Sequence, residues 1–289
     1  MNKLNPLTSL TQAEFDFLLT EFSKQVEDKI LHFTLKGKRR SYPKFNESKL
    51  SSLYGSSIKL EFILIYLKEH PSQRFMGSHF NMSQSKVSEW IAFLLPVLLN
   101  SLKKCSLTFH AIDSFDIPEN LDYILCDVTE RQVARSIDYD VQKEYYSGKK
   151  KMHTVKNLAF SDHTGFIHFI SNTYEGSVHD KSIWDDLVIK ESSINILVDL
   201  GFLGADKNSE NIIMPYKNSK NKKLSYLQTQ INKGISSLRI RVEHAFSGVK
   251  RLKILNQKTR LKISNIHDIL MKIGVGLHNL RVKFRTYAK

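Results

Sequence analysis

The chain has 289 residues, enough for one sizeable core and a smaller module, and its 41% hydrophobic and 25% charged residues exclude a disordered protein. No stretch reaches the roughly 18 uninterrupted apolar residues of a membrane span, and the N-terminal MNKLNPLTSLTQAEF lacks the apolar segment of a signal peptide, so we expect a cytoplasmic protein. The net charge of +14 comes from the last quarter, where Pro215 onward holds 18 Lys and Arg against two acids, and this indicates a polyanionic partner.

The first predicted element is an N-terminal helix that begins after Thr11. Thr11 suits an N-cap, and Glu14 stands three positions later, which is the spacing of a capping box. The basic, turn-prone stretch LKGKRRSYPK (35–44) follows, and it is either a linker or an arm that contacts phosphates. We expect residues 1–57 to form this helix and a basic linker.

The next block is helical and has the proportions of a helix-turn-helix. The expected helices cover residues 58–70, 71–80 and 84–102, with Ser83 as the N-cap of the third. A short helix, a tight turn and a helix that opens on polar residues are typical of this motif, although any three-helix bundle gives a similar pattern. Val87, Trp90 and Ile91 would pack inward, and the side chains expected to face a DNA groove are Gln84, Ser85, Lys86 and Ser88. We place this domain at residues 58–110.

From residue 120 the pattern changes from helices to alternating strands and helices. The expected strands cover residues 122–129, 153–162, 165–174 and 194–202, and the second and third form a hairpin around His163-Thr164-Gly165. SVHDKSIWDDLVIK (177–190) is expected to be a helix, and a long helix near the C-terminus contains Glu243. This order predicts an α/β layer with a mixed sheet over residues 120–289, with basic helices at its C-terminal end.

Asp127 and Asp199 interrupt apolar strands near their ends. A buried carboxylate needs a cation, a metal or a hydrogen-bonded cap, and a lone case is most often a cap. Two such residues followed by a helical Glu243 suit hard divalent cations, which prefer oxygen ligands. Two such ions can activate a nucleophile and stabilise the leaving oxygen of a phosphodiester. For Asp180 we favour a helix-capping role over a metal-ligand role, with Ser177 as the N-cap.

The helix around Glu243 places Arg239, Glu243 and Lys250 on one narrow strip beside its apolar face, and Arg241 and Arg251 on the opposite side. Arg239 and Glu243 are also spaced as an ordinary surface salt bridge, which on its own is the simpler interpretation. The helical period of this segment argues against a disordered basic tail. The two cysteines and the histidines form no cluster with zinc-ligand spacing.

The ordered motifs CDVTE, YYSGKKKMHTVKN, GSVHDKSIWD, VDLGFLG and RIRVEHAFSGVKR resemble the DDE-type transposases of bacterial insertion sequences. The resemblance covers roughly residues 55–285 and is greatest to the fifth insertion-sequence family, which is related to the Harbinger transposases. Asp127 matches the D-x-T motif and Asp199 the D-x-G-(F/Y) motif of that family. Arg239, Glu243 and Lys250 match its Y-x2-R-x3-E-x6-K signature, with Ser236 in place of the tyrosine.

The resemblance implies a ribonuclease-H-like catalytic domain preceded by an all-α helix-turn-helix domain. It implies that Asp127, Asp199 and Glu243 hold two Mg²⁺ ions, for which Mn²⁺ substitutes, and that the enzyme cleaves transposon ends and joins the 3′-hydroxyl to target DNA. The expected partners are terminal inverted repeats, target DNA and further copies of this chain, in a nucleoid-associated, membrane-free setting. Further DNA contacts are expected from Arg239, Lys250, Lys149, Lys150, Lys151, Arg241 and Arg251. The alternatives are a domesticated DDE nuclease and a non-catalytic helix-turn-helix regulator.

Overall fold

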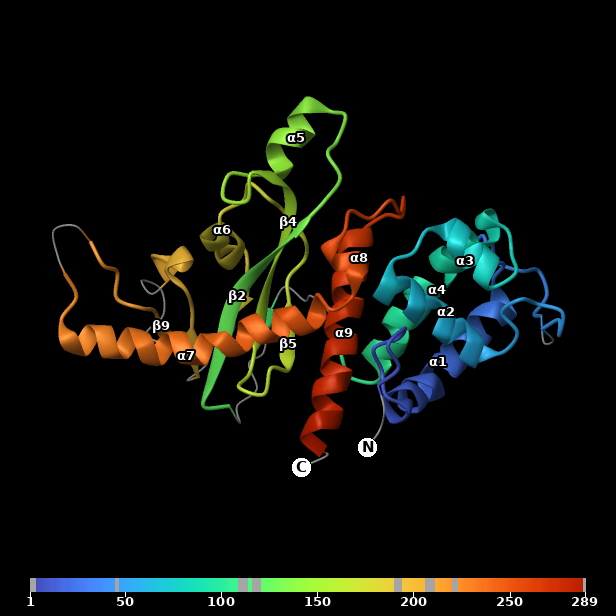
Figure 1. Ribbon diagram of the computed structural model, residues 1–289, viewed down its shortest axis with the longest axis horizontal. Helices are drawn as coiled ribbons and strands as arrows, with labels where there is room; N and C mark the ends of the chain where they lie inside the picture. Colours follow the sequence, from blue (N-terminus) through green and yellow to red (C-terminus); the bar gives the residue numbers. More distant parts are fainter. Residues whose placement is uncertain are drawn as a thin grey trace. The chain divides into compact units, whose positions relative to one another are not determined.

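The computed structural model describes residues 4–44, 47–108, 114–115, 121–189, 194–205, 211–219 and 223–287. The chain forms two compact units, a helical one and one built around a sheet (Figure 1). The helical unit comprises residues 1–108 and 250–284, and the sheet unit comprises residues 109–249 and 285–289. Residues 250–284 therefore pack with the helical unit, although they follow the sheet unit in the sequence.

The helical unit is built from capped helices that share an apolar core. Its helices are α1 (Gln12–His32), α2 (Ser56–Glu69), α3 (Gln73–His79), α4 (Gln84–Lys104), α8 (Lys253–Asn256) and most of α9 (Ile266–Tyr287). The predicted capping box is confirmed, since Thr11 accepts from the Glu14 amide and the Glu14 side chain accepts from the Thr11 amide. Ser83 likewise caps α4 as predicted, by accepting a hydrogen bond from the amide of Lys86.

A tight turn joins α3 to α4 in the predicted helix-turn-helix proportions. Its geometry depends on Gly77, because a Cβ added there would lie 2.6 Å from the carbonyl oxygen of Met82. The amide of Met82 donates to the carbonyl of Gly77 at 2.8 Å, which closes the turn. Val87, Trp90 and Ile91 are buried, as predicted, so the opposite face of the first turns of α4 is directed to solvent.

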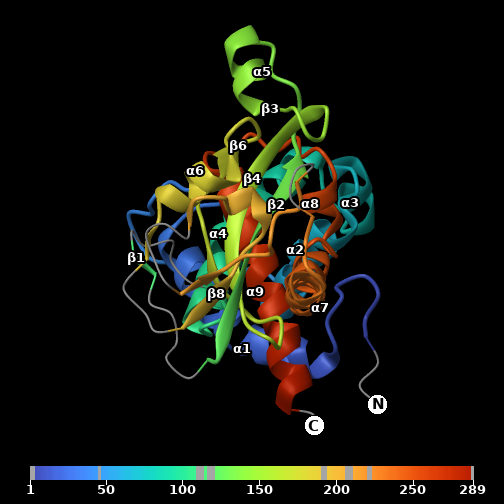
Figure 2. The same cartoon turned by 90° about the vertical axis from the view of Figure 1, so that its left-hand side faces the viewer.

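The sheet unit contains a mixed sheet, as predicted. Its strands lie in the order β3-β4-β2-β8-β9, and β5 and β6 pair with β4. The long strands β2 and β4 are antiparallel and run side by side (Figures 1 and 2), whereas β8 is parallel to both β2 and β9. The strand bounds are β2 Tyr123–Gln132, β3 Tyr146–Ser147, β4 Met152–Ser161, β5 Ile167–Ile170, β6 Tyr174–Glu175, β8 Asn195–Leu197 and β9 Ile212–Ile213. A separate parallel pair joins β1 (Ser114–Phe115) to β7 (Val188–Ile189).

Alternate residues of β2 point to two different surroundings. Ile124 and Cys126 enter a buried cluster with Phe160, Trp184 and Phe202, which belong to β4, α6 (Asp180–Asp185) and a 3-10 turn (Leu200–Phe202). On the other side, α7 (Tyr226–Val249) packs against β2 and crosses it in Figure 1. A short helix, α5 (Tyr139–Tyr145), precedes β3.

Three predicted elements differ from the observed ones. The hairpin between residues 153–162 and 165–174 is present, but its second strand is divided into β5 and β6. Between them the Leu158 amide donates to the side-chain oxygen of Ser171, and the Ser171 carbonyl accepts from the side chain of Asn157, so side chains take the place of backbone ladder bonds. The helix predicted over 177–190 is only α6, and the strand predicted over 194–202 ends at Leu197.

None of the helices described in this chain combines the length and the apolarity that crossing a lipid bilayer requires.

Candidate active site

The two strand-end aspartates are brought together by the register of β2 and β8. These strands are parallel and pair Leu125 with Leu197, so moving two residues along each strand arrives at Asp127 and Asp199. Because side chains alternate between the faces of a sheet, the two carboxylates lie on the same face as the Leu pair. The carboxyl ends of adjacent parallel strands are where open α/β sheets place their ligands.

Both aspartates are held by local hydrogen bonds. The Asp127 Oδ1 atom accepts from the amide of Val128 at 2.9 Å. The Asp199 Oδ1 atom accepts from the amide of Gly201 at 2.7 Å and so caps the 3-10 turn that follows β8. The Asp127 side chain is 21% exposed and the Asp199 side chain 42% exposed, so a ligand in solution can reach both.

Arg239 lies on the buried stripe of α7. The stripe consists of Ile235, Val242, Ala245, Phe246 and Val249. Arg239 falls within it, because it lies four residues after Ile235 and three before Val242. Its Nη2 atom is 3.3 Å from Asp199 Oδ2 and 3.7 Å from Asp127 Oδ1, and its side chain is only 16% exposed. One guanidinium therefore pairs with both carboxylates and balances only one of their two negative charges. Its Nε atom is buried and has no hydrogen-bond partner among the described residues.

The surroundings of Asp127 favour a cation. Burial raises the pKa of Asp127 to about 6, although Arg239 and the Val128 amide act in the opposite direction. The negative charges of Asp199 and Asp180 add to the increase. A carboxylate at this position costs free energy that a bound cation would recover.

Glu243 is not part of this ion-pair cluster. It lies one helical turn after Arg239 but is exposed. Each residue of a helix is rotated by about 100° from the one before it, so Glu243 points away from the buried face to which Val242 belongs. The ion pairs of Asp127 and Asp199 are made with Arg239 instead. Within the part of the chain that is described, no three His, Cys, Asp or Glu side chains converge closely enough to hold a metal ion.

The other basic residues of the prediction lie at the surface or close to it. Arg241 is exposed and donates from Nη1 to the carbonyl of His163, in the turn between β4 and β5, at 3.1 Å. Lys149, Lys150 and Lys151 are exposed in the turn between β3 and β4, about 25 Å along β4 from the partner of Asp127. Lys250 and Arg251 directly follow the last residue of α7, and Ser236 is exposed on that helix.

Asp180 has a different partner from the predicted one. The helix cap predicted at Ser177 is wrong, because α6 begins at Asp180 with His179 as N-cap and no capping side chain. The Asp180 Oδ1 atom instead accepts from Lys156 Nζ at 3.0 Å, and Lys156 also donates to the carbonyl of Val178 at 2.7 Å. Lys156 was not among the predicted site residues. It lies two residues before Leu158 in β4 and so points to the same, core side of the sheet, where a lysine needs a partner.

The helix-turn-helix residues are positioned for contact with a ligand. Gln84, Ser85, Lys86 and Ser88 are all exposed on α4. Lys86 Nζ pairs with Glu89 at 2.7 Å, and Gln84 Nε2 donates to Gln73 of α3. The face of α4 opposite the buried residues is thus polar over its first turns.

Comparisons with known proteins match two segments of the chain to families. Residues 59–104 match the family described as helix-turn-helix of DDE superfamily endonuclease, and residues 126–279 match DDE superfamily endonuclease. A probable transposase for insertion sequence element IS702 of Microchaete diplosiphon is 28% identical over 200 residues, which cover 68% of this chain and 71% of that protein. No solved structure matches the chain. The predicted resemblance and fold class are confirmed.

Proposed function

This chain belongs to the DDE superfamily of endonucleases, and we propose that it is a transposase that cuts DNA at the ends of an insertion sequence and joins the freed 3′-hydroxyl to target DNA. The observation that carries the proposal is the pair of in-register aspartates, Asp127 and Asp199, on the sheet face that α7 covers. The third acid in this proposal is Glu243, one turn along α7 from the arginine that already contacts the pair.

The aspartate pair fits a hard divalent cation. It offers carboxylate oxygens that are partly exposed, and its first member has a raised pKa because its charge is poorly solvated. Asp127, Asp199 and Glu243 would hold two Mg²⁺ ions, or Mn²⁺ in their place. The ions would supply activation of the attacking oxygen and charge stabilisation of the leaving oxygen.

Two residues of α7, Arg239 and Glu243, would complete the proposed site. Glu243 lies about 6 Å along the helix axis and about 40° around it from Arg239, so a rotation of α7 about its axis would turn its carboxylate toward the aspartate pair. Arg239 would lower the repulsion between the two carboxylates, with which it pairs.

The DNA in this proposal is bound by both units. The polar face of α4 would read the terminal inverted repeat, and the exposed lysines Lys149, Lys150 and Lys151, with Arg241 and Arg251, would contact the backbone. Lys250, at the end of α7, would bind phosphate as well. Pairing two transposon ends requires at least two copies of the chain, so we propose an oligomer as the active form.

The experiment that tests the proposal is cleavage of a labelled duplex that carries the element's own end, with Mg²⁺ and with EDTA. We expect nicking only with Mg²⁺. Asp127→Asn and Glu243→Gln should each lower the nicking rate by roughly a thousandfold, since several kcal/mol of charge stabilisation depend on the bound ions. Asp140→Asn, which removes an exposed carboxylate of α5, is the matched control and should nick normally.

The outcomes separate this function from its alternatives. DNA binding in EDTA should survive in both active-site variants, since they leave the helix-turn-helix intact. Full nicking by either variant contradicts the site assignment. Nicking without joining of the 3′-hydroxyl to a second duplex indicates a nuclease, and binding without any metal-dependent nicking indicates a regulator.

A further inference from the structure

The basic stretch that follows α1 is an ordered turn. Phe33 and Arg39 form an antiparallel β-bridge, and Gly37 closes the loop between them with a φ of 77°, which glycine adopts without a steric penalty. The sequence left two interpretations open for residues 35–44, a linker or a phosphate-contacting arm. A closed turn over residues 33–40, called the basic turn below, argues against a flexible linker.

The basic turn uses one of its cations as an anchor and exposes the others. Arg40 Nε donates to the carbonyls of Ile30 and Phe33, at 3.1 Å each, and so fastens the turn to the end of α1. The exposed cations are Lys36, Lys38 and Arg39. Because the backbone that carries them is fixed, they lose less conformational freedom on binding an anion than cations in a flexible tail would.

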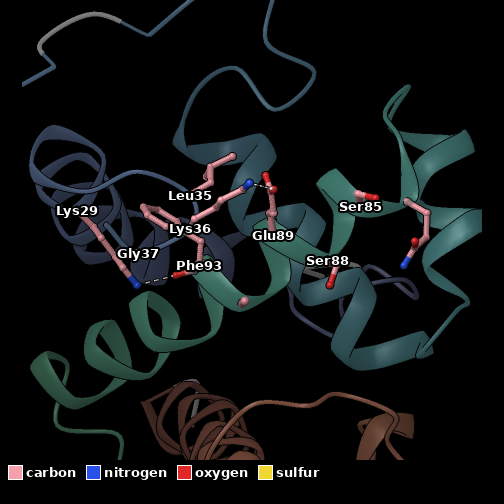
Figure 3. A pocket seen from close by; sticks show the side chains of 10 residues that line it. Lys29, Leu35, Lys36, Gly37, Ser85, Ser88, Glu89 and Phe93 are labelled. Atoms are coloured by element: carbon pink, nitrogen blue, oxygen red, sulfur yellow. Dashed lines mark hydrogen bonds and ion pairs between the residues drawn. The ribbon is translucent and has the colours of Figure 1, made fainter. Parts of the chain in front are cut away.

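A groove of about 520 Å³ runs between the basic turn and the first turns of α4 (Figure 3). From α4 it is lined mainly by small or polar residues, namely Gln84, Ser85, Ser88 and Ala92. From the opposite side it is lined by Lys29, Leu35, Lys36 and Gly37. The groove therefore has predicted DNA-reading residues on one side and lysines on the other.

Glu89 ties the two sides of the groove together. Its carboxylate lies 2.7 Å from Lys86 Nζ of the same helix and 3.9 Å from Lys36 Nζ of the basic turn (Figure 3). It is the only acid among the described residues that line the groove. Since the Lys36 side chain is 79% exposed, this long ion pair orients the lysine without using its capacity to bind another anion.

We propose that the basic turn is a second DNA-contacting element. In it, Lys36, Lys38 and Arg39 hold the phosphate backbone that borders the DNA groove into which α4 inserts. This proposal rests on the proposed function, because it requires the helix-turn-helix to bind duplex DNA. Phosphate contacts of this kind position a recognition helix and carry no sequence information. The turn lies outside residues 59–104, which match the helix-turn-helix family, so the contact is an addition to that motif.

The test is the salt dependence of DNA binding by the full chain in EDTA, measured by fluorescence anisotropy. The probes are a duplex with the element's own end and a scrambled duplex of equal length. The test variant is Lys36→Ala/Lys38→Ala. The matched control is Lys24→Ala/Lys104→Ala, which removes two exposed lysines near Cys105, at the other end of α4 and about 30 Å from its first turn.

We expect the test variant to bind both duplexes roughly tenfold more weakly and to reduce the slope of log K against log salt by about 2, while the control keeps the wild-type slope. Equal slopes for the test variant and the wild type overturn the proposal, as does an equal loss in the control. If the wild type binds neither duplex, the proposed function fails instead. Urea unfolding of both variants confirms that exposed substitutions leave the fold intact.

Discussion

The aspartate pair and Glu243 belong to one proposed site, but the fold positions them by different means. Asp127 and Asp199 are fixed by the hydrogen-bonded register of two adjacent parallel strands. Glu243 is carried by a helix, and its position depends on the rotation of α7 about its own axis. Backbone hydrogen bonds therefore fix the strand pair, whereas the helical acid lies outside the ion-pair cluster.

This difference gives Arg239 a role between the two strand acids. Two carboxylates on one face of a sheet repel each other, and a cation beside both lowers that repulsion. Arg239 supplies this cation from the buried face of α7. With that face against the sheet, Glu243 is left exposed.

The largest expected effect is on metal affinity, which should fall more when a strand aspartate is replaced than when Glu243 is replaced. Asp199→Asn should weaken Mn²⁺ binding by roughly a hundredfold or more, about 3 kcal/mol, because it removes a charge that is always in place. Glu243→Gln should weaken it by roughly tenfold, since this acid must first move. Isothermal titration with Mn²⁺ in the absence of DNA measures both. Equal losses would show that Glu243 is as well positioned as the strand pair.

A second prediction concerns the stability of the metal-free protein. Asp127→Asn should raise the free energy of unfolding by about 2–3 kcal/mol at pH 7.5, since burial raises the pKa of Asp127 to about 6 in the folded state. The carboxyl group of Asp127 binds its proton more tightly in the folded wild type than in the unfolded chain. The contribution of Asp127 to the free energy of unfolding is therefore greatest below about pH 4 and falls as the pH rises to about 6.

The gain in free energy of unfolding of Asp127→Asn over the wild type should accordingly shrink to under about 1 kcal/mol near pH 4. Urea unfolding in EDTA at several pH values checks this. Glu243→Gln is the comparison variant and should change stability by no more than about 0.5 kcal/mol, because its side chain is exposed. An equal gain in both variants would contradict the distinction between the two kinds of acid.

A third prediction removes the cation between the aspartates. Arg239→Met should destabilise the metal-free protein by about 1–2 kcal/mol, because two carboxylates are left facing each other without a partner. Millimolar Mg²⁺ should restore most of the loss. Arg241→Met, which changes an exposed arginine two positions along the same helix, should have little effect with or without Mg²⁺. Failure of Mg²⁺ to restore stability would mean that the cluster does not bind it.

The smallest effect is expected at Asp180. Its carboxylate is held by Lys156 at 3.0 Å, and this ion pair gives it a structural role beside the site. Asp180→Asn should lower the nicking rate by less than tenfold while reducing the free energy of unfolding by about 1 kcal/mol. A loss as large as that of Asp127→Asn would place Asp180 among the catalytic acids.

Much of the fold follows from local patterns in the sequence. The Thr11 and Ser83 caps and the buried face of α4 depend on residues a few positions apart, and all three predictions are confirmed. The long helix around Glu243 was predicted for the same reason. The predicted strand over 194–202 was too long, because Asp199 caps a 3-10 turn instead of continuing β8. An apolar run alone does not reveal where such a turn begins.

The candidate site could be predicted only in part, because its contacts join distant segments. Helix geometry placed Arg239 beside the apolar face, but its contact with both aspartates depends on how α7 packs on β2. The Lys156–Asp180 pair likewise joins β4 to α6, and periodicity within one element does not show it. Motif resemblance predicts the three acids, and it carries no information about which of them share an ion pair in the fold.

The parallel pairing of β2 and β8 also determines where the chain tolerates insertions. The segment between Asp127 and Asp199 contains a hairpin and α6, yet the two acids are brought together by the pairing of Tyr123–Leu125 with Asn195–Leu197. Loops in this segment can therefore lengthen or shorten without moving the carboxylates. A single residue added inside β8, in contrast, would turn Asp199 to the opposite face of the sheet.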